Sequence, residues 1–352
     1  MSDFLPNASF ATTARSKAAI FTYTQSYYGD IIEIQGKLSC NPEIYTRTSN
    51  GTTVLPISED LPPKRFTPLA TRYVFYLDDK NRLCDTYFDT QWHQGSLVSK
   101  NWVAAPYSQL AAIQLTNSIG ANFICVYYQD TADSGDIKQV SYSHSGWEAG
   151  PPPINDPPLI RTSLSVVAPE AGIRSAVSHD SAAPVVFFQY NSLGLGSSQD
   201  LGDDDYTIYP IQQHTRAMSA HASIAAVDDG KNCYLFYTSD DNSVQQMRIA
   251  ATGAIHQPVS VGLAMQPIPA SPLTAMMFND APGTIILFCL LHWATDTKST
   301  DKTNIYAATL TRRSTADADA DNWNVSAQGK KEKQKSDVEG VTAHASPSLW
   351  RD

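Results

Sequence analysis

Residues 108–150, SQLAAIQLTNSIGANFICVYYQDTADSGDIKQVSYSHSGWEAG, contain four short runs of strand-forming residues separated by turn residues. Residues 110–113 are small and apolar, and residues 123–128 are rich in β-branched and aromatic types. Residues 137–142 alternate in polarity, and residues 147–150 (WEAG) end the unit. Runs of this length, bounded by Gly, Asn, Asp and Ser, predict an antiparallel meander of four strands.

The same four-part unit recurs along the chain. One copy precedes it as PLA, YVFY, RLCD and WHQG in residues 68–95. Residues 223–249 contain three of the four parts, and residues 273–323 contain all four. We expect residues 17–20 (KAAI) to begin another unit, with residues 173–176 and 184–189 marking a sixth.

Six units of roughly 40 to 65 residues, with four strands each, are typical of a β-propeller. We therefore predict an all-β fold, a six-bladed β-propeller of four-stranded antiparallel blades, closed between its N- and C-terminal segments. The apolar tail, residues 341–350, is predicted to complete that closure and so to remove free sheet edges. A tandem row of unrelated β-domains is the alternative, which units too short to bury a core alone disfavour.

The whole chain, residues 1–352, is expected to form this single domain. Loop insertions are predicted near residues 193–205, 294–303 and 312–340, where Gly, Asp and other polar residues gather. The first of these is too rich in Gly and Asp to predict a packed strand, so we expect an exposed loop.

The overall charge restricts the partners. The net charge of −10 and pI near 5.2 argue against nucleic acid and anionic membranes. No apolar run reaches membrane-spanning length, so we expect a soluble protein without membrane insertion. The N-terminus lacks the basic and apolar regions of a signal peptide, although a signal that has already been removed stays possible. The sequence leaves open where the protein is located and whether it forms a homodimer. The five cysteines occur singly, which predicts no metal site.

The repeat resembles that of the fungal fucose-specific lectins, whose blades carry Ala-Ala-Ile, then R-V-Y-x-Q, then I-R-E, then W-x-x-G. The matching residues here are 111–113 (AAI), 126–129 (VYYQ), 137–139 (IKQ) and 147–150 (WEAG). Residues 92–95 (WHQG) fit as well, and residues 346–350 (SPSLW) resemble the terminal Pro and Trp of the family. This resemblance covers nearly the whole chain and implies the propeller fold.

In those lectins, the Arg before V-Y and the Glu of I-R-E hold the hydroxyls of fucose, and an aromatic ring covers the apolar face of the sugar. At the Arg position this chain has Tyr73, Cys125, Val185 and Tyr234. At the Glu position it has Asp85, Gln139 and Gln246. Because charged, bidentate contacts are not replaceable by apolar groups, we expect the sugar sites to be lost.

A chain that keeps the lectin fold but has lost the sugar sites resembles the hetero-Diels-Alderases of fungal tropolonic sesquiterpenoid (eupenifeldin-type) pathways. Those enzymes themselves resemble fucose lectins. That resemblance implies a pericyclase of secondary metabolite biosynthesis that joins a tropolone o-quinone methide to a humulene-type alkene. Its substrates would be small and apolar, and it would require no cofactor. Holding the two reactants face to face supplies most of the rate gain, and a Tyr or His donor at the heterodiene carbonyl adds electrostatic help.

Candidate residues follow from the predicted ends of the strands. A polar and aromatic loop is expected after the first strand, and other candidates follow the matching strands of units four and six. The expected catalytic residues are Tyr23, Tyr27 and His292. The expected substrate-binding residues are Gln25, Tyr28, His179, Phe278, Asn279 and Trp293.

Each of these residues also fits a purely structural role, as a packing aromatic or a hydrogen-bonded histidine. Two other functions stay open from the sequence: a fucose-type carbohydrate-binding lectin with altered sites, and a scaffold or interaction protein. No nucleophile elbow, phosphate loop or paired carboxylates support a hydrolase or a kinase.

Overall fold

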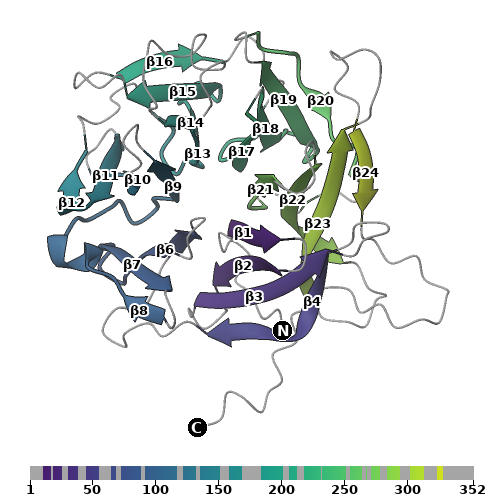
Figure 1. Cartoon of the computed structure of the whole chain (residues 1–352). Helices are drawn as coiled ribbons and strands as arrows, with labels where there is room; N and C mark the ends of the chain where they lie inside the picture. The colour runs from purple at the N-terminus through teal and green to yellow at the C-terminus, as the bar shows by residue number, and fades with distance from the viewer. Residues whose placement is uncertain are drawn as a thin grey trace.

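In the computed structural model, four-stranded antiparallel sheets stand in a ring, and each sheet is built from four strands consecutive in the chain (Figure 1). The structure describes residues 11–16, 19–25, 31–38, 45–54, 65–68, 73–88, 92–116, 122–131, 135–150, 158–168, 184–200, 206–211, 218–230, 232–250, 254–263, 267, 271–277, 284–293, 302–312 and 323–327. Within these ranges there are six such sheets, as the repeats predicted.

The first half of the chain forms three sheets. Sheet 1 comprises β1 (Ala11–Ser16), β2 (Ala19–Gln25), β3 (Ile31–Leu38) and β4 (Tyr45–Val54). Sheet 2 comprises β5 (Arg65–Pro68), β6 (Tyr73–Leu77), β7 (Leu83–Phe88) and β8 (Trp92–Gln94), followed by the 3-10 turn η1 (Leu97–Lys100). Sheet 3 comprises β9 (Leu110–Thr116), β10 (Asn122–Gln129), β11 (Ile137–Ser143) and β12 (Gly146–Ala149).

The second half repeats this order. Sheet 4 comprises β13 (Ser165–Val167), β14 (Val185–Gln189), β15 (Leu195–Asp200) and β16 (Tyr206–Pro210). Sheet 5 comprises β17 (Ile224–Asp228), β18 (Asn232–Thr238), β19 (Val244–Ala250) and β20 (Val259–Ser260). Sheet 6 comprises β21 (Thr274–Met277), β22 (Thr284–Trp293), β23 (Lys302–Arg312) and β24 (Trp323–Ala327).

The first strand of each sheet contacts the first strands of both neighbouring sheets, so that β1 touches β5 on one side and β21 on the other. The sheets therefore follow one another around a central axis, which is the arrangement of a β-propeller (Figure 1). The predicted closing segment, residues 341–350, lies outside the described residues, so closure by the tail stays a prediction.

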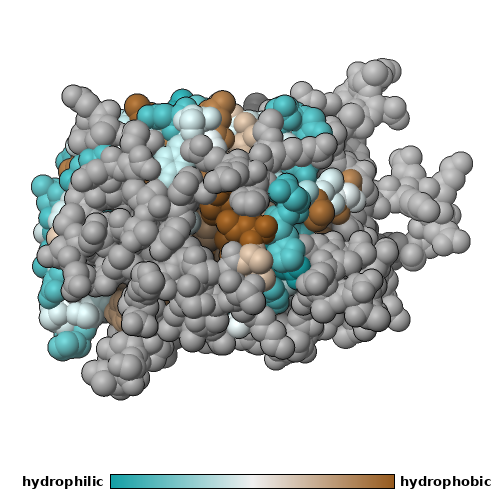
Figure 2. Space-filling view, turned by 90° about the horizontal axis from the view of Figure 1, so that it is seen from above, coloured by the Kyte–Doolittle hydropathy of each residue, from teal (hydrophilic) through white to brown (hydrophobic). Residues whose placement is uncertain are grey.

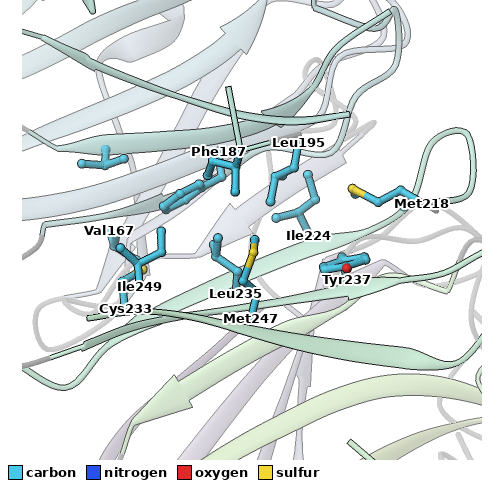
Figure 3. Close-up of a cluster of buried hydrophobic side chains, with 13 residues drawn as sticks. Val167, Phe187, Leu195, Met218, Ile224, Cys233, Leu235, Tyr237, Met247 and Ile249 are labelled. Carbon is cyan, nitrogen blue, oxygen red and sulfur yellow. The ribbon is translucent and has the colours of Figure 1, made fainter. Parts of the chain in front are cut away.

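The core lies between the faces of neighbouring sheets. Between sheets 4 and 5, side chains such as Phe187, Leu235 and Met247 pack together without access to water (Figure 3). Similar clusters lie between sheets 2 and 3, 3 and 4, and 5 and 6. Burying each large apolar side chain contributes about 1.5–3 kcal/mol, so the stability of sheets 2 to 6 depends on packing against their neighbours.

Polar side chains also join neighbouring units. The Gln189 side chain donates from Nε2 to the carbonyl oxygen of Ser219 at 2.9 Å and accepts from the backbone N–H of His221 at 3.0 Å. Gln129 donates in the same way to the carbonyl of Leu159 at 3.2 Å. The Gln of the V-Y-x-Q motif therefore ties the second strand of one sheet to the connection that leads into the next sheet.

The expected start of the first unit is wrong. Residues 17–20 were matched to the innermost strand, but β1 (Ala11–Ser16) occupies that place and Ala19 already belongs to β2. β1 reads ATTARS, so it alternates small and polar residues and lacks the apolar run that marks other inner strands. Pairing with β2, rather than local hydrophobicity, decides its role.

Two further expected strand positions are corrected. The innermost strand of sheet 2 is β5 (Arg65–Pro68), slightly earlier than residues 68–70. In sheet 4 the innermost strand is β13 (Ser165–Val167), not residues 173–176, which lie outside the described residues. Short apolar tripeptides of this kind occur several times in the chain, so their sequence alone does not fix which one pairs.

Part of the loop predicted at residues 193–205 is a strand. β15 (Leu195–Asp200) pairs with both β14 and β16, and Leu195, Gly196 and Ser197 are buried. A Cβ on Gly196 would lie 2.1 Å from a ring carbon of Tyr190, so this glycine is needed for close packing of the ring against the strand. The two later insertions are also shorter than predicted, because residues 302–312 and 323–327 form β23 and β24.

The cysteines of the described strands are buried free thiols: Cys84, Cys125, Cys233 and Cys289. Burial raises the pKa of Cys84 to about 12, so this thiol stays protonated and unreactive. Cys40 lies outside the described residues. In the part of the chain that the structure describes, no helix is long and apolar enough to cross a membrane.

Candidate functional site

The ladder between the second and third strands defines two equivalent positions in every sheet. The aromatic residue of the V-Y motif pairs with the last residue of the I-R-E motif, as Tyr127 pairs with Gln139 in sheet 3. The position of the family arginine lies two residues before that aromatic residue, on the same face of the strand. We call these the arginine position and the glutamate position.

No sheet has arginine at the arginine position. The residues at the arginine and glutamate positions, from sheet 1 to sheet 6, are Phe21 and Glu33, Tyr73 and Asp85, Cys125 and Gln139, Val185 and Ser197, Tyr234 and Gln246, and Ile286 and Ala307. Only sheets 1 and 2 keep an acidic residue at the glutamate position. The charged pair that would hold sugar hydroxyls is therefore absent from all six sheets.

In sheet 3 the two positions bind each other. Gln139 donates from Nε2 to Ser141 Oγ at 3.0 Å and to Cys125 Sγ at 3.5 Å. Both Cys125 and Gln139 are buried. This neutral network occupies the space between sheets 3 and 4 with internal hydrogen bonds, so it offers no charged group to a ligand.

In sheet 5 an arginine lies on the strand next to the arginine position. Tyr234 pairs across the ladder with Arg248, which is 3% exposed and whose Nη2 lies 3.0 Å and 3.1 Å from the two ring nitrogens of His256. The hydroxyl of Tyr234 donates to Asp229 at 3.0 Å. The guanidinium of sheet 5 therefore belongs to Arg248, two residues beyond Gln246, on the third strand rather than the second.

Sheet 2 has a continuous row of aromatic rings on its face toward sheet 3. Tyr73 stacks on Tyr87 with ring centroids 5.5 Å apart, and Tyr87 stacks on His93 at 5.3 Å. We call these three residues the ring row. All three side chains are only partly buried, whereas Phe75 at the inner end is fully buried against Trp147 of sheet 3. The ring row is therefore partly accessible to solvent.

A buried carboxyl group lies beside the ring row. Asp85 is 3% exposed, and its Oδ1 accepts a hydrogen bond from the backbone N–H of Leu97 at 2.8 Å. Burial raises the pKa of Asp85 to about 6, although two backbone hydrogen bonds act in the opposite direction. Burial, then Tyr142 and Asp85, raise the pKa of Tyr73, so this phenol is a neutral hydrogen-bond donor at physiological pH.

The expected catalytic residues are only partly placed by the structure. Tyr23 and Gln25 lie inside β2, not in a loop after the first strand, and Tyr23 pairs with Glu33. Thr and Tyr favour strands, which explains why this segment extends the ladder. His292 and Trp293 end the apolar strand β22, as expected, and His292 pairs with Thr303. Tyr27, Tyr28, His179, Phe278 and Asn279 lie outside the described residues.

Several residues near the arginine and glutamate positions are not among the candidates that the sequence suggests. Glu33 lies at the glutamate position of sheet 1 and is buried. Tyr87 and Arg248 pair with the residues at the arginine positions of sheets 2 and 5, and His93 pairs with Tyr87. The signal that could have found them is the ladder register, because cross-strand pairs link each of them to a motif position. On the face seen in Figure 2, hydrophobic and hydrophilic residues lie side by side, with a hydrophobic group near the middle of the view.

Comparison with known proteins identifies what this fold is similar to. A sequence profile described as fungal fucose-specific lectin matches residues 7–262. Among solved structures, the chain is similar to AofleA from Arthrobotrys oligospora, at 15% identity and a TM-score of 0.66 over 93% of this chain and 88% of that one. It is also similar to the Aleuria aurantia lectin, described as a six-bladed β-propeller that recognises fucose, at 17% identity and a TM-score of 0.65 over 93% and 96% of the two chains.

A bacterial lectin, BP39L from Burkholderia pseudomallei, has the same fold at 12% identity and a TM-score of 0.57, over 91% of this chain and 98% of that one. A search of curated proteins finds no sequence match. Identities this low establish the fold alone, so the ligand has to be argued from the residues between the sheets.

Proposed function

This chain belongs to the fungal fucose-specific lectin family, and from that premise we propose that it is a cofactor-independent hetero-Diels-Alderase rather than a sugar binder. The proposed reaction joins a tropolone o-quinone methide to a humulene-type alkene in the biosynthesis of a sesquiterpenoid secondary metabolite. The observation that carries this proposal is the loss of the Arg–Glu pair from all six sheets of a family that is named for fucose recognition.

The residues that replace the pair favour an apolar ligand. Val185 and Ile286 are buried and apolar, and Cys125 is held in an internal network. Fucose presents several hydroxyls, and leaving these without partners in a water-poor site costs about 1–3 kcal/mol for each group. A planar polyene or tropolone presents few hydroxyls and gains free energy from apolar and aromatic contacts.

The proposed reaction needs few chemical groups from the protein. In the cycloaddition, the carbonyl oxygen and the exocyclic carbon of the quinone methide each form a σ bond to one alkene carbon, so no atom is lost and no oxidant is consumed. Binding both reactants in one orientation removes most of the entropic barrier. A hydrogen-bond donor at the carbonyl oxygen stabilises the negative charge that grows there as the exocyclic carbon bonds to the alkene, before the C–O bond is complete.

Tyr23, Tyr27 and His292 remain our candidates for that donor, with Gln25, Tyr28, His179, Phe278, Asn279 and Trp293 as candidates for substrate contact. Tyr23 and His292 occupy the second strands of sheets 1 and 6, which are neighbours in the ring because β1 contacts β21. This neighbourhood is compatible with one shared site.

The test mixes the purified protein with a humulene-type alkene and a hydroxymethyl precursor that loses water to give the quinone methide. We expect faster cycloaddition and a single dominant stereoisomer, whereas the uncatalysed mixture gives several slowly. Heat-denatured protein and bovine serum albumin serve as controls for non-specific apolar binding. Product ratios identical with and without the folded protein would contradict the proposal.

A lectin with altered sites is the second candidate, and one observation favours it. Glu33 is buried at the glutamate position of sheet 1, where a carboxylate can still accept hydrogen bonds from sugar hydroxyls. The partner position holds Phe21, so a retained site would be neutral on that side. Titration with a panel of fucosylated and other glycans tests it, and saturable binding that Glu33→Gln abolishes would support the lectin.

A further inference from the structure

The turn between β14 and β15 has a leucine where the turns of three other sheets have asparagine or glycine. Leu193 has a positive φ of 65° and is 42% exposed. The equivalent residues of sheets 2, 3 and 5, matched by the hydrogen bonds of their turns, are Asn81, Gly135 and Asn242. Their φ angles are 61°, 62° and 60°, a region that Asn and Gly adopt readily and that strains a leucine. A side chain that strains its turn and leaves apolar surface in water indicates contact with another molecule.

Hydrogen bonds join this turn to the end of sheet 5. Gln189 Nε2 donates to the carbonyl oxygens of Leu193 at 3.3 Å and Ser219 at 2.9 Å. Ser219 Oγ donates to the carbonyl oxygen of Ser239 at 2.8 Å, in the turn between β18 and β19. Residues 191–194, 218–221 and 239–242 therefore form one continuous surface at the end of sheets 4 and 5, which are neighbours in the ring (Figure 1). We call this surface the end face.

The backbone of the end face is held in place before any partner arrives. Ala220 and His221 are exposed beside Leu193, and His221 also has a positive φ, of 60°. Gln189 Oε1 accepts a hydrogen bond from the backbone N–H of His221 at 3.0 Å, so one buried glutamine fixes both the turn and the connection. A partner that docks here has little backbone to order, which lowers the entropic cost of association.

The charges of the end face differ between its two halves. The turn of sheet 5 has two exposed carboxylates, Asp240 and Asp241, and Asp241 Oδ1 accepts from the backbone N–H of Ser243 at 2.9 Å. The turn of sheet 4, residues 191–194, contains no charged residue. Arg161 is exposed in the connection into sheet 4, at the position that His221 has in the connection into sheet 5. The acidic half therefore belongs to sheet 5, and the neutral to basic half belongs to sheet 4.

We propose that the end face is the interface of a symmetric homodimer of this chain. A twofold axis between sheets 4 and 5 exchanges their ends, so the acidic turn of each copy meets the neutral and basic half of the other. This complementarity matters because the chain has a net charge of −10, so two copies otherwise repel each other.

Leu193 supplies the apolar contact of the proposed interface. Its turn is hydrogen-bonded to the connection that leads from sheet 4 to sheet 5, where the twofold axis passes. The leucines of both copies thus lose their exposed surface near the centre of the interface. Because the same face is used by both copies, the assembly stops at two chains. The dimer requires neither the pericyclase nor the lectin function.

Sedimentation velocity of the full chain over a dilution series tests the proposal. We expect a species of twice the 38.5 kDa chain mass that dissociates on dilution. Leu193→Asn should weaken the dimer about tenfold or more, because the central apolar contact is lost. Val103→Asn is the matched control: Val103 is 41% exposed but lies outside the end face, so this variant should dimerise like the wild type.

A second measurement separates loss of the interface from misfolding. At concentrations where both proteins are monomeric, Leu193→Asn should have a higher thermal midpoint than the wild type, because asparagine is less strained at this φ. Asp240→Asn should weaken the dimer and reduce its dependence on salt. A wild-type chain that stays monomeric at the highest concentration reached, or equal dimerisation of Leu193→Asn and the wild type, would overturn the interface.

Discussion

The side chain of Asp85 accepts a hydrogen bond from the backbone N–H of Leu97 at 2.8 Å, so a buried carboxyl group joins β7 to the turn η1. Burial raises the pKa of Asp85 from 3.8 to about 6. The folded state therefore binds a proton more tightly at this group than the unfolded state does. The ionised form costs stability, and this cost grows as the pH rises from about 4 through about 6.

Replacing Asp85 by Asn should remove this cost while keeping an acceptor for Leu97. A shift of two pKa units corresponds to about 3 kcal/mol, which is the upper bound for the gain expected at neutral pH. Denaturant unfolding of both proteins between acid and neutral pH measures it. The stability difference should be largest at neutral pH and shrink toward pH 4, and a difference that stays constant over this range would contradict the prediction.

Gly95 should not tolerate a side chain. A Cβ at this position would lie 1.9 to 2.2 Å from the carboxyl atoms of Asp85, which is shorter than any real contact. Gly95→Ala should therefore destabilise the protein by about 1–3 kcal/mol through overpacking. In the double variant with Asp85→Ala, this penalty should largely disappear, and a thermal unfolding cycle of the four proteins measures the coupling. Additive effects would show that the two residues do not compete for the same space.

Gln189 should contribute strongly to stability because it joins sheet 4 to the segment leading into sheet 5. Gln189→Leu leaves the Ser219 carbonyl and the His221 N–H without this partner, at a cost of about 2–4 kcal/mol. Gln94→Leu alters an exposed glutamine of β8 and should change stability by less than about 0.5 kcal/mol. Chemical denaturation of the two variants compares them, and equal effects would exclude the linking role.

Fucose should bind weakly or not at all. Calorimetric titration with methyl fucoside is expected to give no heat of saturable binding, because every sheet lacks arginine at the arginine position. The Aleuria aurantia lectin is a suitable positive control. Several sites of micromolar affinity in this chain would restore the lectin function and remove the main support for the pericyclase.

The candidate donors lead to a kinetic prediction. If Tyr23, Tyr27 or His292 donates to the heterodiene carbonyl, its removal should slow cycloaddition roughly 10²- to 10³-fold. Tyr23→Phe, Tyr27→Phe and His292→Ala are compared by product formation, with circular dichroism to verify folding. Undiminished activity in all three would refute this choice of residues but would leave the reaction itself unaffected.

Much of the fold could be predicted because propeller strands have a local signature. Segments such as residues 73–76 and 234–237 combine aromatic and β-branched residues between turn residues, and all of them form second strands. β1 and β15 could not be recognised in this way. The first is small and polar, and the second contains Gly196, whose role depends on the ring of Tyr190 in the same unit.

The candidate site was less predictable. The residues at the arginine and glutamate positions were readable from the motifs, and the ladder register agrees with them in every unit that was compared. Tyr87 belongs to no motif of the repeat, and His93 occupies a variable position of the W-x-x-G motif. They stack only because β6, β7 and β8 pair in one register, which brings residues from three strands onto one face.

The sequence alone thus determined the number of units, their four-stranded plan and the loss of the charged sugar-binding pair, because these depend on residue types at short, repeated spacings. The tertiary structure decided which strands begin sheets 1 and 4, the burial of β15 and the assembly of the ring row beside Asp85. Those features depend on cross-strand register and on contacts between sheets. Such contacts join residues distant in the chain, and no local pattern encodes their relative position.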